Sequence, residues 1–209
     1  MTLTRSTDLR ILRFPIKSGQ VLRSINETAP DYVFIGGSVI TETHFDEKVK
    51  AVREATDLPL VLFPGSPTQL TPHVDAVLFL SLISGRNPEL LIGHHVTAAP
   101  RVRELGLEAV PTGYMLIDGG MPTTASYISN TQPIPRDKAA IAAATAMAGE
   151  LLGLKCIYLD AGSGAALPVP TKVIQAVRKA VKLPLIVGGG IRTGVQRDAA
   201  FNAGADLVV

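Results

Sequence analysis

The sequence predicts an α/β protein, a modified TIM (β/α)8 barrel with parallel strands, and three observations favour this fold. Short apolar segments alternate with helical patterns roughly every 20 to 30 residues. Eight candidate strands occur along the 209 residues. Glycine and polar residues follow several of these strands, where barrels build their sites. An open doubly wound sheet is the alternative, because near-continuous apolar strands covered on both faces fit both folds.

The first half of the chain supplies four of these strands. They are predicted at residues 9–16, 32–38, 59–66 and 75–81. The first strand is atypical, because its apolar residues alternate poorly and Pro15 lies near its end. Apolar residues at helical spacing predict a helix over 46–55. Asn87, as N-cap, and Pro88 predict the start of another helix that runs through about His95.

The second half repeats the alternation and contains one long connection. Strands are predicted at residues 108–117, 155–160, 184–187 and 205–209, and helices at 136–152 and 170–181. Segment 119–135 is rich in Thr, Ser, Asn, Gly and Pro and is too long for a bare connection. We expect it to be either a functional loop or an oligomer contact. The chain ends inside the last predicted strand, so the final barrel helix is absent from this chain, and residues 1–209 are expected to form a single domain.

Composition limits the classes of function. With 46% hydrophobic residues, the chain can bury one sizeable core. A formal net charge of +2 and scattered basic residues argue against a nucleic-acid groove but leave small anionic substrates open. The single cysteine, Cys156, lies in an apolar strand, which predicts a structural thiol, no intramolecular disulfide and a reducing cytoplasm. The sequence has no signal-peptide core and no apolar run near the ~20 residues of a membrane span.

The ends of two successive predicted strands contain the residues that indicate a chemical function. The strand at 155–160 stops at Asp160 and breaks into Gly162-Ser163-Gly164, and the strand at 184–187 continues into Gly188-Gly189-Gly190. Glycine lets backbone N–H groups approach an anion, and the following helix N-terminus adds partial positive charge. The pair therefore predicts a phosphate cradle. By themselves such clusters suit a phosphate-binding barrel isomerase or a flavin enzyme equally well.

Six motifs in order carry a resemblance to a known family. They are Phe34-Ile35-Gly36-Gly37-Ser38, Leu62-Phe63-Pro64-Gly65-Ser66, residues 80–88, Pro111-Thr112-Gly113-Tyr114, residues 158–164 and Gly188-Gly189-Gly190-Ile191-Arg192. From about Tyr32 to its end the chain closely resembles the geranylgeranylglyceryl phosphate synthase family, whose neighbours are the heptaprenylglyceryl phosphate synthases.

The resemblance implies a reaction and its partners. The implied enzyme is a Mg²⁺-dependent prenyltransferase that condenses sn-glycerol 1-phosphate with geranylgeranyl diphosphate and releases diphosphate, in ether lipid synthesis. It further implies a cytoplasmic homo-oligomer, hexamer or dimer, that contacts a membrane peripherally to reach its lipid substrate.

The resemblance also implies a site for glycerol 1-phosphate. Asp160 is expected to be the catalytic base, and Tyr158 to act beside it by hydrogen bonding to the phosphate. The site comprises Tyr158, Leu159, Asp160, Ala161, Gly162, Ser163, Gly164, Gly189 and Gly190. The alternative for Asp160 is a structural carboxylate that caps the turn after its strand.

Four further residues are assigned to the second substrate and its metal. Lys17, Arg86 and Tyr114 are expected to contact prenyl diphosphate, and Ser38 is expected to be a magnesium ligand. A surface arginine beside a helix N-cap is the alternative for Arg86, and a packed aromatic residue is the alternative for Tyr114.

Two departures from the family open a further hypothesis. Segment 13–17 lacks the acidic residue that the family carries at the end of its first strand, and the Gly-Asn turn and terminal helix of the family do not follow Val209. A catalytically impaired homologue that serves as a binding or assembly unit is therefore a third interpretation. His94 and His95 are adjacent and diverge in direction, so we expect both on the surface rather than in a metal site.

Overall fold

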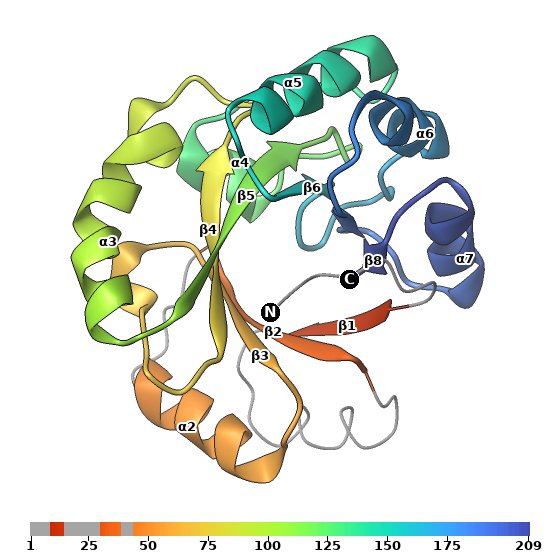
Figure 1. Ribbon diagram of the computed structural model, residues 1–209. Coiled ribbons are helices and arrows are strands. Elements are labelled where there is room, and N and C mark those ends of the chain that lie inside the picture. The colour runs from red at the N-terminus through yellow and green to blue at the C-terminus, as the bar shows by residue number, and fades with distance from the viewer. Residues whose placement is uncertain (1–8, 15–29, 39–43) are drawn as a thin grey trace.

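The computed structural model describes residues 9–14, 30–38 and 44–209. Within them, eight parallel strands pair in chain order and close into a barrel (Figure 1). The strands are β1 (Leu9–Phe14), β2 (Tyr32–Gly37), β3 (Leu60–Pro64), β4 (Ala76–Leu82), β5 (Glu108–Leu116), β6 (Cys156–Asp160), β7 (Leu185–Gly188) and β8 (Leu207–Val208). The predicted barrel is confirmed, and the open sheet is wrong because β1 pairs with β8 as well as with β2.

Helices surround the barrel on its outside, as Figure 1 shows. They are α2 (Phe45–Ala55), α3 (His94–Glu104), α4 (Thr124–Ser129), α5 (Ala139–Leu151), α6 (Thr171–Ala180) and α7 (Gly194–Asn202), with a 3-10 turn η1 (Pro67–Gln69) and a π-helical turn η2 (Glu89–Gly93). One apolar cluster fills the barrel with alternate strand residues such as Phe34, Leu78 and Ile186. Two others lie between strands and helices, one under α2 and α3 and one under α5 to α7.

Cys156 is the first residue of β6 and is fully buried in the barrel cluster. Burial raises the pKa of its thiol to about 12, and its Sγ lies 3.6 Å from Thr112 Oγ1. A thiol with so high a pKa is rarely ionised and is therefore a poor nucleophile. This environment is consistent with the predicted structural role of the thiol.

The helix after β4 is longer than the sequence predicts. Turn η2 runs directly into α3, so helical structure continues to Glu104, past the predicted end near His95. The predicted boundary is wrong. Helix α3 continues even through Pro100, a residue that usually breaks helices. Asn87 does cap the first turn, since its Oδ1 accepts a hydrogen bond of 3.0 Å from the Glu89 amide.

The expected surface position of His95 is wrong. Its ring packs edge-on against Phe79 of β4, with ring centroids 4.4 Å apart, and its side chain is buried. Its Nε2 lies 3.4 Å from Ser81 Oγ. The physical reason is that α3 extends past His95, and this face of the longer helix lies against β4.

The long connection after β5 contains regular structure of its own. It contains the short helix α4, which begins with a capping box between Thr123 and Ser126. It is also tied back to the barrel, because Ile134 forms a parallel bridge to Ile117 and joins the core.

Two parts of the barrel, four strands apart, each contain the same kind of contact. Residues 49–66 and 174–191 align without gaps, with Leu-Pro-Leu at the start of both β3 and β7. In the first copy, Arg53 of α2 forms an ion pair of 2.9 Å with Asp75, which also accepts a 2.7 Å hydrogen bond from the Leu60 amide. We call this arrangement a clasp, because it ties a helix to two strands.

The second copy repeats the clasp. Arg178 of α6 lies 2.9 Å from Asp206, whose Oδ2 accepts a 2.8 Å hydrogen bond from the Leu185 amide. In both copies the guanidinium also donates to carbonyl oxygens just after its own helix. The repeated sequence and contact indicate that the barrel consists of two related halves.

The two clasps differ in exposure, and their contributions to stability should differ accordingly. The side chains of Arg178 and Asp206 are 15% and 12% exposed, whereas those of Arg53 and Asp75 are 28% and 52% exposed. Arg178→Met removes the guanidinium from a mostly buried carboxylate and should lower the free energy of unfolding by about 2 to 3 kcal/mol. Arg53→Met, the matched variant, should cost less than about 1 kcal/mol because water screens that pair.

Urea denaturation of the two variants and the wild type measures both values. Equal losses for the two variants would contradict the view that burial decides the strength of the clasp.

Candidate active site

Asp160 is the last residue of β6 and lies between two neighbouring strands, opposite Leu116 of β5 and Gly188 of β7. Its carboxylate is fully buried. Oδ2 accepts a 2.7 Å hydrogen bond from the Tyr114 hydroxyl, and Oδ1 accepts a 2.6 Å hydrogen bond from the Gly162 amide. The carboxylate therefore does cap the turn after its strand, and it also faces a tyrosine from β5 inside the barrel.

Three aromatic rings pack beside this carboxylate. Tyr114 and Tyr158 are perpendicular with ring centroids 5.5 Å apart, and Phe63 lies 5.6 Å from Tyr114 and 5.4 Å from Tyr158. Tyr158 is fully buried two residues before Asp160, on the same face of β6. Its hydroxyl comes so close to β7 that a Cβ on Gly188 would lie 2.7 Å from it. These rings pack around Tyr114, whose hydroxyl holds the Asp160 carboxylate.

The two glycine segments converge, as their spacing predicts. A Cβ on Gly189 would lie 2.5 Å from both Asp160 Oδ1 and the Gly162 nitrogen, and the φ of Gly189 is +80°. Arg192 links the loops as well, because its guanidinium donates a 2.7 Å hydrogen bond to the Ala165 carbonyl oxygen. The loops after β6 and β7 thus form one rigid cradle.

The cradle keeps several amides available for an anion. The Gly162 amide is already used by Asp160, so it is a weaker candidate than the sequence predicts. The amides of Ser163, Gly164, Gly189 and Gly190 donate no hydrogen bond within the part of the chain that the structure describes. Backbone N–H groups left free by glycine turns are typical of phosphate sites.

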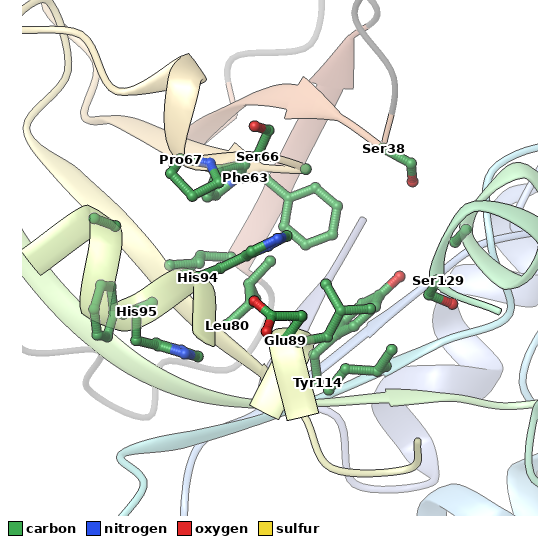
Figure 2. A pocket seen from close by; sticks show the side chains of 18 of the residues that line it. Ser38, Phe63, Ser66, Pro67, Leu80, Glu89, His94, His95, Tyr114 and Ser129 are labelled. Carbon is green, nitrogen blue, oxygen red and sulfur yellow. The ribbon is translucent and has the colours of Figure 1, made fainter. Parts of the chain in front are cut away.

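A groove of 310 Å³ opens on the β2-to-β5 side of the barrel, and its wall includes Tyr114, which donates to Asp160. The ends of β2 to β5, turns η1 and η2, and helices α3 and α4 line it, mostly with apolar side chains. In Figure 2, Ser38 and Ser129 lie on one side of the groove, Pro67 and His95 lie on the other, and Tyr114 lies between them. The groove volume is in the range of ligand pockets in proteins.

Polar side chains in the groove wall include Asn87, Glu89, His94 and His95. His95 Nδ1 has no hydrogen-bond partner among the described residues. Burial, followed by the neighbouring charge of His94, lowers the pKa of the His95 imidazole below its ordinary value, although nearby backbone groups partly offset this. The imidazole is therefore neutral at neutral pH, and this part of the wall suits an apolar ligand.

The predicted contacts of the second substrate fall into three groups. Tyr114 and Ser38 line the groove, and Tyr114 also binds Asp160. Arg86 is exposed, and its guanidinium donates a 2.7 Å hydrogen bond to the adjacent Gly85 carbonyl oxygen, as a surface arginine would. Lys17 lies outside the described residues.

Sequence reasoning missed part of this wall. Phe63 and Leu80 belong to predicted strands, but only the barrel geometry shows that their side chains reach the groove. Ala125 and Ile128 were missed because helix α4 was expected to be loop. Within the described chain there is no group of three His, Cys, Asp or Glu side chains that could hold a metal ion, and no helix is long and apolar enough to cross a membrane.

Comparison with known proteins identifies relatives along most of the chain. The model of the PcrB family matches residues 17–209. A geranylgeranylglyceryl phosphate synthase from Chitinophaga pinensis is 56% identical over 86% of this chain and 71% of its own length. One from Pyrococcus furiosus is 43% identical over 93% of this chain and 77% of its own length.

A solved structure is also similar. It is (S)-3-O-geranylgeranylglyceryl phosphate synthase from Thermoplasma acidophilum in complex with substrate sn-glycerol-1-phosphate. It superposes with a TM-score of 0.89 at 31% identity, over 98% of this chain and 85% of that one. An N-acetylmannosamine-6-phosphate 2-epimerase from Clostridium perfringens, with a TM-score of 0.61 and 13% identity, shares the fold alone.

The cradle depends on Gly189 more than on glycines elsewhere with similar backbone angles. Gly189→Ala would place a methyl group against Asp160 and the Gly162 amide, and should weaken binding of a phosphomonoester at least about tenfold. Gly153→Ala is the matched control, since Gly153 also has positive φ, at +87°, but has nothing within 4 Å of its Cβ position.

Calorimetric titration with glycerol 1-phosphate measures both variants. The control should bind like the wild type and lose only about 1 kcal/mol of stability. Unchanged phosphate binding by the Gly189 variant would remove the cradle from the site.

Proposed function

This chain belongs to the PcrB family, and on that basis we propose that it joins sn-glycerol 1-phosphate to geranylgeranyl diphosphate as a prenyltransferase. The observation that carries the proposal is that Tyr114, which lines an apolar groove, donates a hydrogen bond to Asp160, the buried carboxylate that also caps the turn of the glycine cradle. The names of the relatives and the glycerol phosphate bound to the Thermoplasma acidophilum protein support it.

The proposed reaction forms one bond and breaks another. The free hydroxyl oxygen of glycerol 1-phosphate bonds to the first carbon of the prenyl chain, and the bond from that carbon to the diphosphate oxygen breaks. The diphosphate leaves with the electron pair, and the hydroxyl proton goes to a base. Because the carbon is allylic and becomes cationic early, stabilisation of the leaving group should contribute most to the rate.

The phosphate of glycerol 1-phosphate would bind to the amides of Ser163, Gly164, Gly189 and Gly190. The Gly162 turn then serves mainly to hold Asp160. In this arrangement the alcohol end of the substrate extends toward the carboxylate, which is the only acidic side chain that the described loops after β6 and β7 turn into the barrel. Asp160 is thus our candidate for the base that receives the proton.

Tyr114 would act in two ways. Its hydroxyl donates to Asp160 Oδ2, which leaves Oδ1 and the remaining lone pairs to the turn and the substrate. Its ring lines the groove, where an electron-rich face stabilises a developing allylic cation. The two alternatives for Tyr114, a packed aromatic and a substrate contact, are compatible in this geometry.

The prenyl chain would occupy the groove between β4 and α3. The wall there is formed by Phe79, Leu80, Ala98 and the neutral His95. An apolar groove whose wall is linked to the phosphate cradle through the hydrogen bond from Tyr114 to Asp160 suits a prenyl donor, whereas an isomerase or flavin enzyme that acts on a small polar substrate would not need one.

Magnesium would arrive with the substrate. Ser38 is the one ligand that the resemblance implies among the described residues, and a hydroxyl without a carboxylate does not make a magnesium site. We therefore propose that Mg²⁺ binds as a complex with the diphosphate, which supplies charged oxygens, and that Ser38 adds one neutral ligand. When bound, the ion neutralises charge on the leaving diphosphate.

We also propose that the protein is a homo-oligomer, a dimer or hexamer, located in the cytoplasm. Helix α5 supports the proposed oligomer, because it is almost wholly apolar and exposes Ile141, Met147 and Leu151. The buried Cys156 thiol supports the proposed cytoplasmic location, since no disulfide stabilises the chain.

The role of Asp160 predicts the effect of two substitutions. Asp160→Asn keeps the shape and the hydrogen bond to Gly162 but removes the base, so kcat should fall by roughly a hundredfold to ten-thousandfold. Tyr114→Phe removes one hydrogen bond to the carboxylate and should lower kcat about tenfold. Tyr32→Phe, at the opposite end of β2 from the site, is the matched control and should leave kcat unchanged.

Rates of ether formation from labelled glycerol 1-phosphate measure all three variants. An Asp160→Asn enzyme with nearly full activity would assign the base to another group. A wild-type protein that makes no ether product with any prenyl diphosphate would favour the impaired homologue.

The magnesium proposal predicts that a chelator stops the reaction without affecting the fold. Removal of Mg²⁺ should abolish product formation, and its return should restore it, while the melting temperature of the protein without diphosphate stays the same. Ser38→Ala should raise the Mg²⁺ concentration needed for half-maximal rate several-fold. A rise in melting temperature with Mg²⁺ alone would indicate instead a metal site preformed in the protein.

A further inference from the structure

The amides of Ser163 and Gly164 belong to a tight turn at the start of the loop after β6. The Ala165 amide donates a 3.2 Å hydrogen bond to the Gly162 carbonyl oxygen, which closes a four-residue turn. Gly164, the third residue of this turn, has a φ of +78°, as a type II turn requires. Neither central amide donates a hydrogen bond among the described residues, so both are available to a ligand.

The start of this turn is packed on both sides. The Gly162 amide donates to Asp160, and a Cβ on Gly162 would lie 2.6 Å from the Thr123 hydroxyl oxygen. A Cβ on Gly119 would lie 2.7 Å from the Ala165 Cβ. These contacts hold the first residue of the turn and the side chain of its last residue.

Arg192, in the loop after β7, holds the backbone that leaves the turn. Its guanidinium donates a 2.7 Å hydrogen bond to the Ala165 carbonyl oxygen and a longer one, of 3.4 Å, to the Ala166 carbonyl oxygen. A guanidinium presents several donors in a rigid, planar fork and can therefore bind two neighbouring carbonyl oxygens at once. Arg192 thus ties the end of the turn to the opposite loop of the cradle.

The backbone of Arg192 is itself fixed. Its amide and the Thr193 amide donate to Gln196 Oε1 over 2.8 and 3.2 Å, and the Thr193 hydroxyl accepts a hydrogen bond from the Gln196 amide. These contacts include the capping box that begins helix α7. The guanidinium therefore extends from a fixed point, and its two hydrogen bonds set the spacing between the loops after β6 and β7.

We propose that Arg192 is a positioning residue for the phosphate of glycerol 1-phosphate. It holds the turn of Ser163 and Gly164 in place beside the glycines of the next loop, and it acts through that turn rather than by a bond to the phosphate. This role rests on the proposed function, in which the amides of the two loops bind the phosphate together.

Direct attraction between the guanidinium and the phosphate is the alternative. Arg192 is exposed, and water and salt screen the attraction between exposed charges. A guanidinium turned toward the phosphate would also give up both of its hydrogen bonds to the loop after β6. The geometry therefore favours the positioning role.

Calorimetric titration with sn-glycerol 1-phosphate and, separately, with inorganic phosphate tests this role. Arg192→Ala should weaken the binding of both ligands about tenfold, because the loss lies at the phosphate end of the site. Arg197→Ala is the matched control, since it removes the same charge from the neighbouring helix α7, where the guanidinium lies 2.7 Å from Asp198. The control should bind both ligands like the wild type.

Arg192→Lys separates the fork from the charge. Lysine keeps the positive charge but presents it on a single nitrogen, so this variant should bind about threefold more weakly than the wild type. The difference between the wild type and Arg192→Ala should persist at high salt, because salt screens charge attraction but does not undo the ordering of a turn. A lysine variant that binds like the wild type, or a difference that disappears at high salt, would overturn the positioning role.

Steady-state rates of ether formation give a second measurement. Arg192→Ala should raise the KM for glycerol 1-phosphate about tenfold and change kcat by less than about twofold. The reason is that Tyr114 and the Gly162 amide, rather than Arg192, hold Asp160. A fall in kcat with an unchanged KM would overturn the role, and so would equal losses of affinity in Arg192→Ala and Arg197→Ala.

The results for this role and for the proposed function can be told apart. A wild-type protein that binds glycerol 1-phosphate but forms no ether would overturn the proposed function, while tenfold weaker binding by Arg192→Ala would still support the positioning role. A wild type that forms ether, with an Arg192→Ala variant that binds phosphate equally well, would overturn only the role of Arg192.

Discussion

The site depends on one shared carboxylate. Asp160 binds the Tyr114 hydroxyl through one oxygen and the Gly162 amide through the other, so it joins β5, β6 and the turn that begins the phosphate cradle. Gly189 of the next loop approaches so closely that only glycine fits. A charged group fixed from three sides needs little reorganisation when a substrate binds, which is how preorganised sites lower activation barriers. The groove reaches this group through Tyr114, which lines the groove wall and donates to the carboxylate.

Much of this arrangement could be predicted from the sequence. Apolar strands that end in glycine indicated the barrel and the convergence of Gly162 and Gly189, because parallel strands present their carboxyl ends at one face. The contact between Tyr114 and Asp160 could not be predicted, since it depends on the register of β5 against β6. The burial of His95 was mispredicted because both adjacent histidines were expected on the surface, whereas α3 turns the His95 ring against Phe79 of β4.

The groove wall shows a second limit of sequence reasoning. Its residues come from strands, from a π-helical turn and from the short helix α4, and they share no periodic pattern along the chain. Periodicity reports which face of one element is buried, but a groove between elements is defined by tertiary packing. Family resemblance supplied the roles of Asp160 and Ser38, and the structure alone supplied Phe63 and Ile128 as neighbours of the same groove.

The two clasps also bear on how the barrel assembles. Each ties a helix to strands nearby in sequence, so each half has mainly local contacts, which form quickly during folding. By contrast, β1 joins β8, the strand farthest from it in sequence, through two residue pairs, as few as join β3 to β4 or β7 to β8, whereas β4 joins β5 through seven. The ring should therefore close late and open first, and amide hydrogens along the seam between β1 and β8 should exchange with solvent sooner than those between β4 and β5.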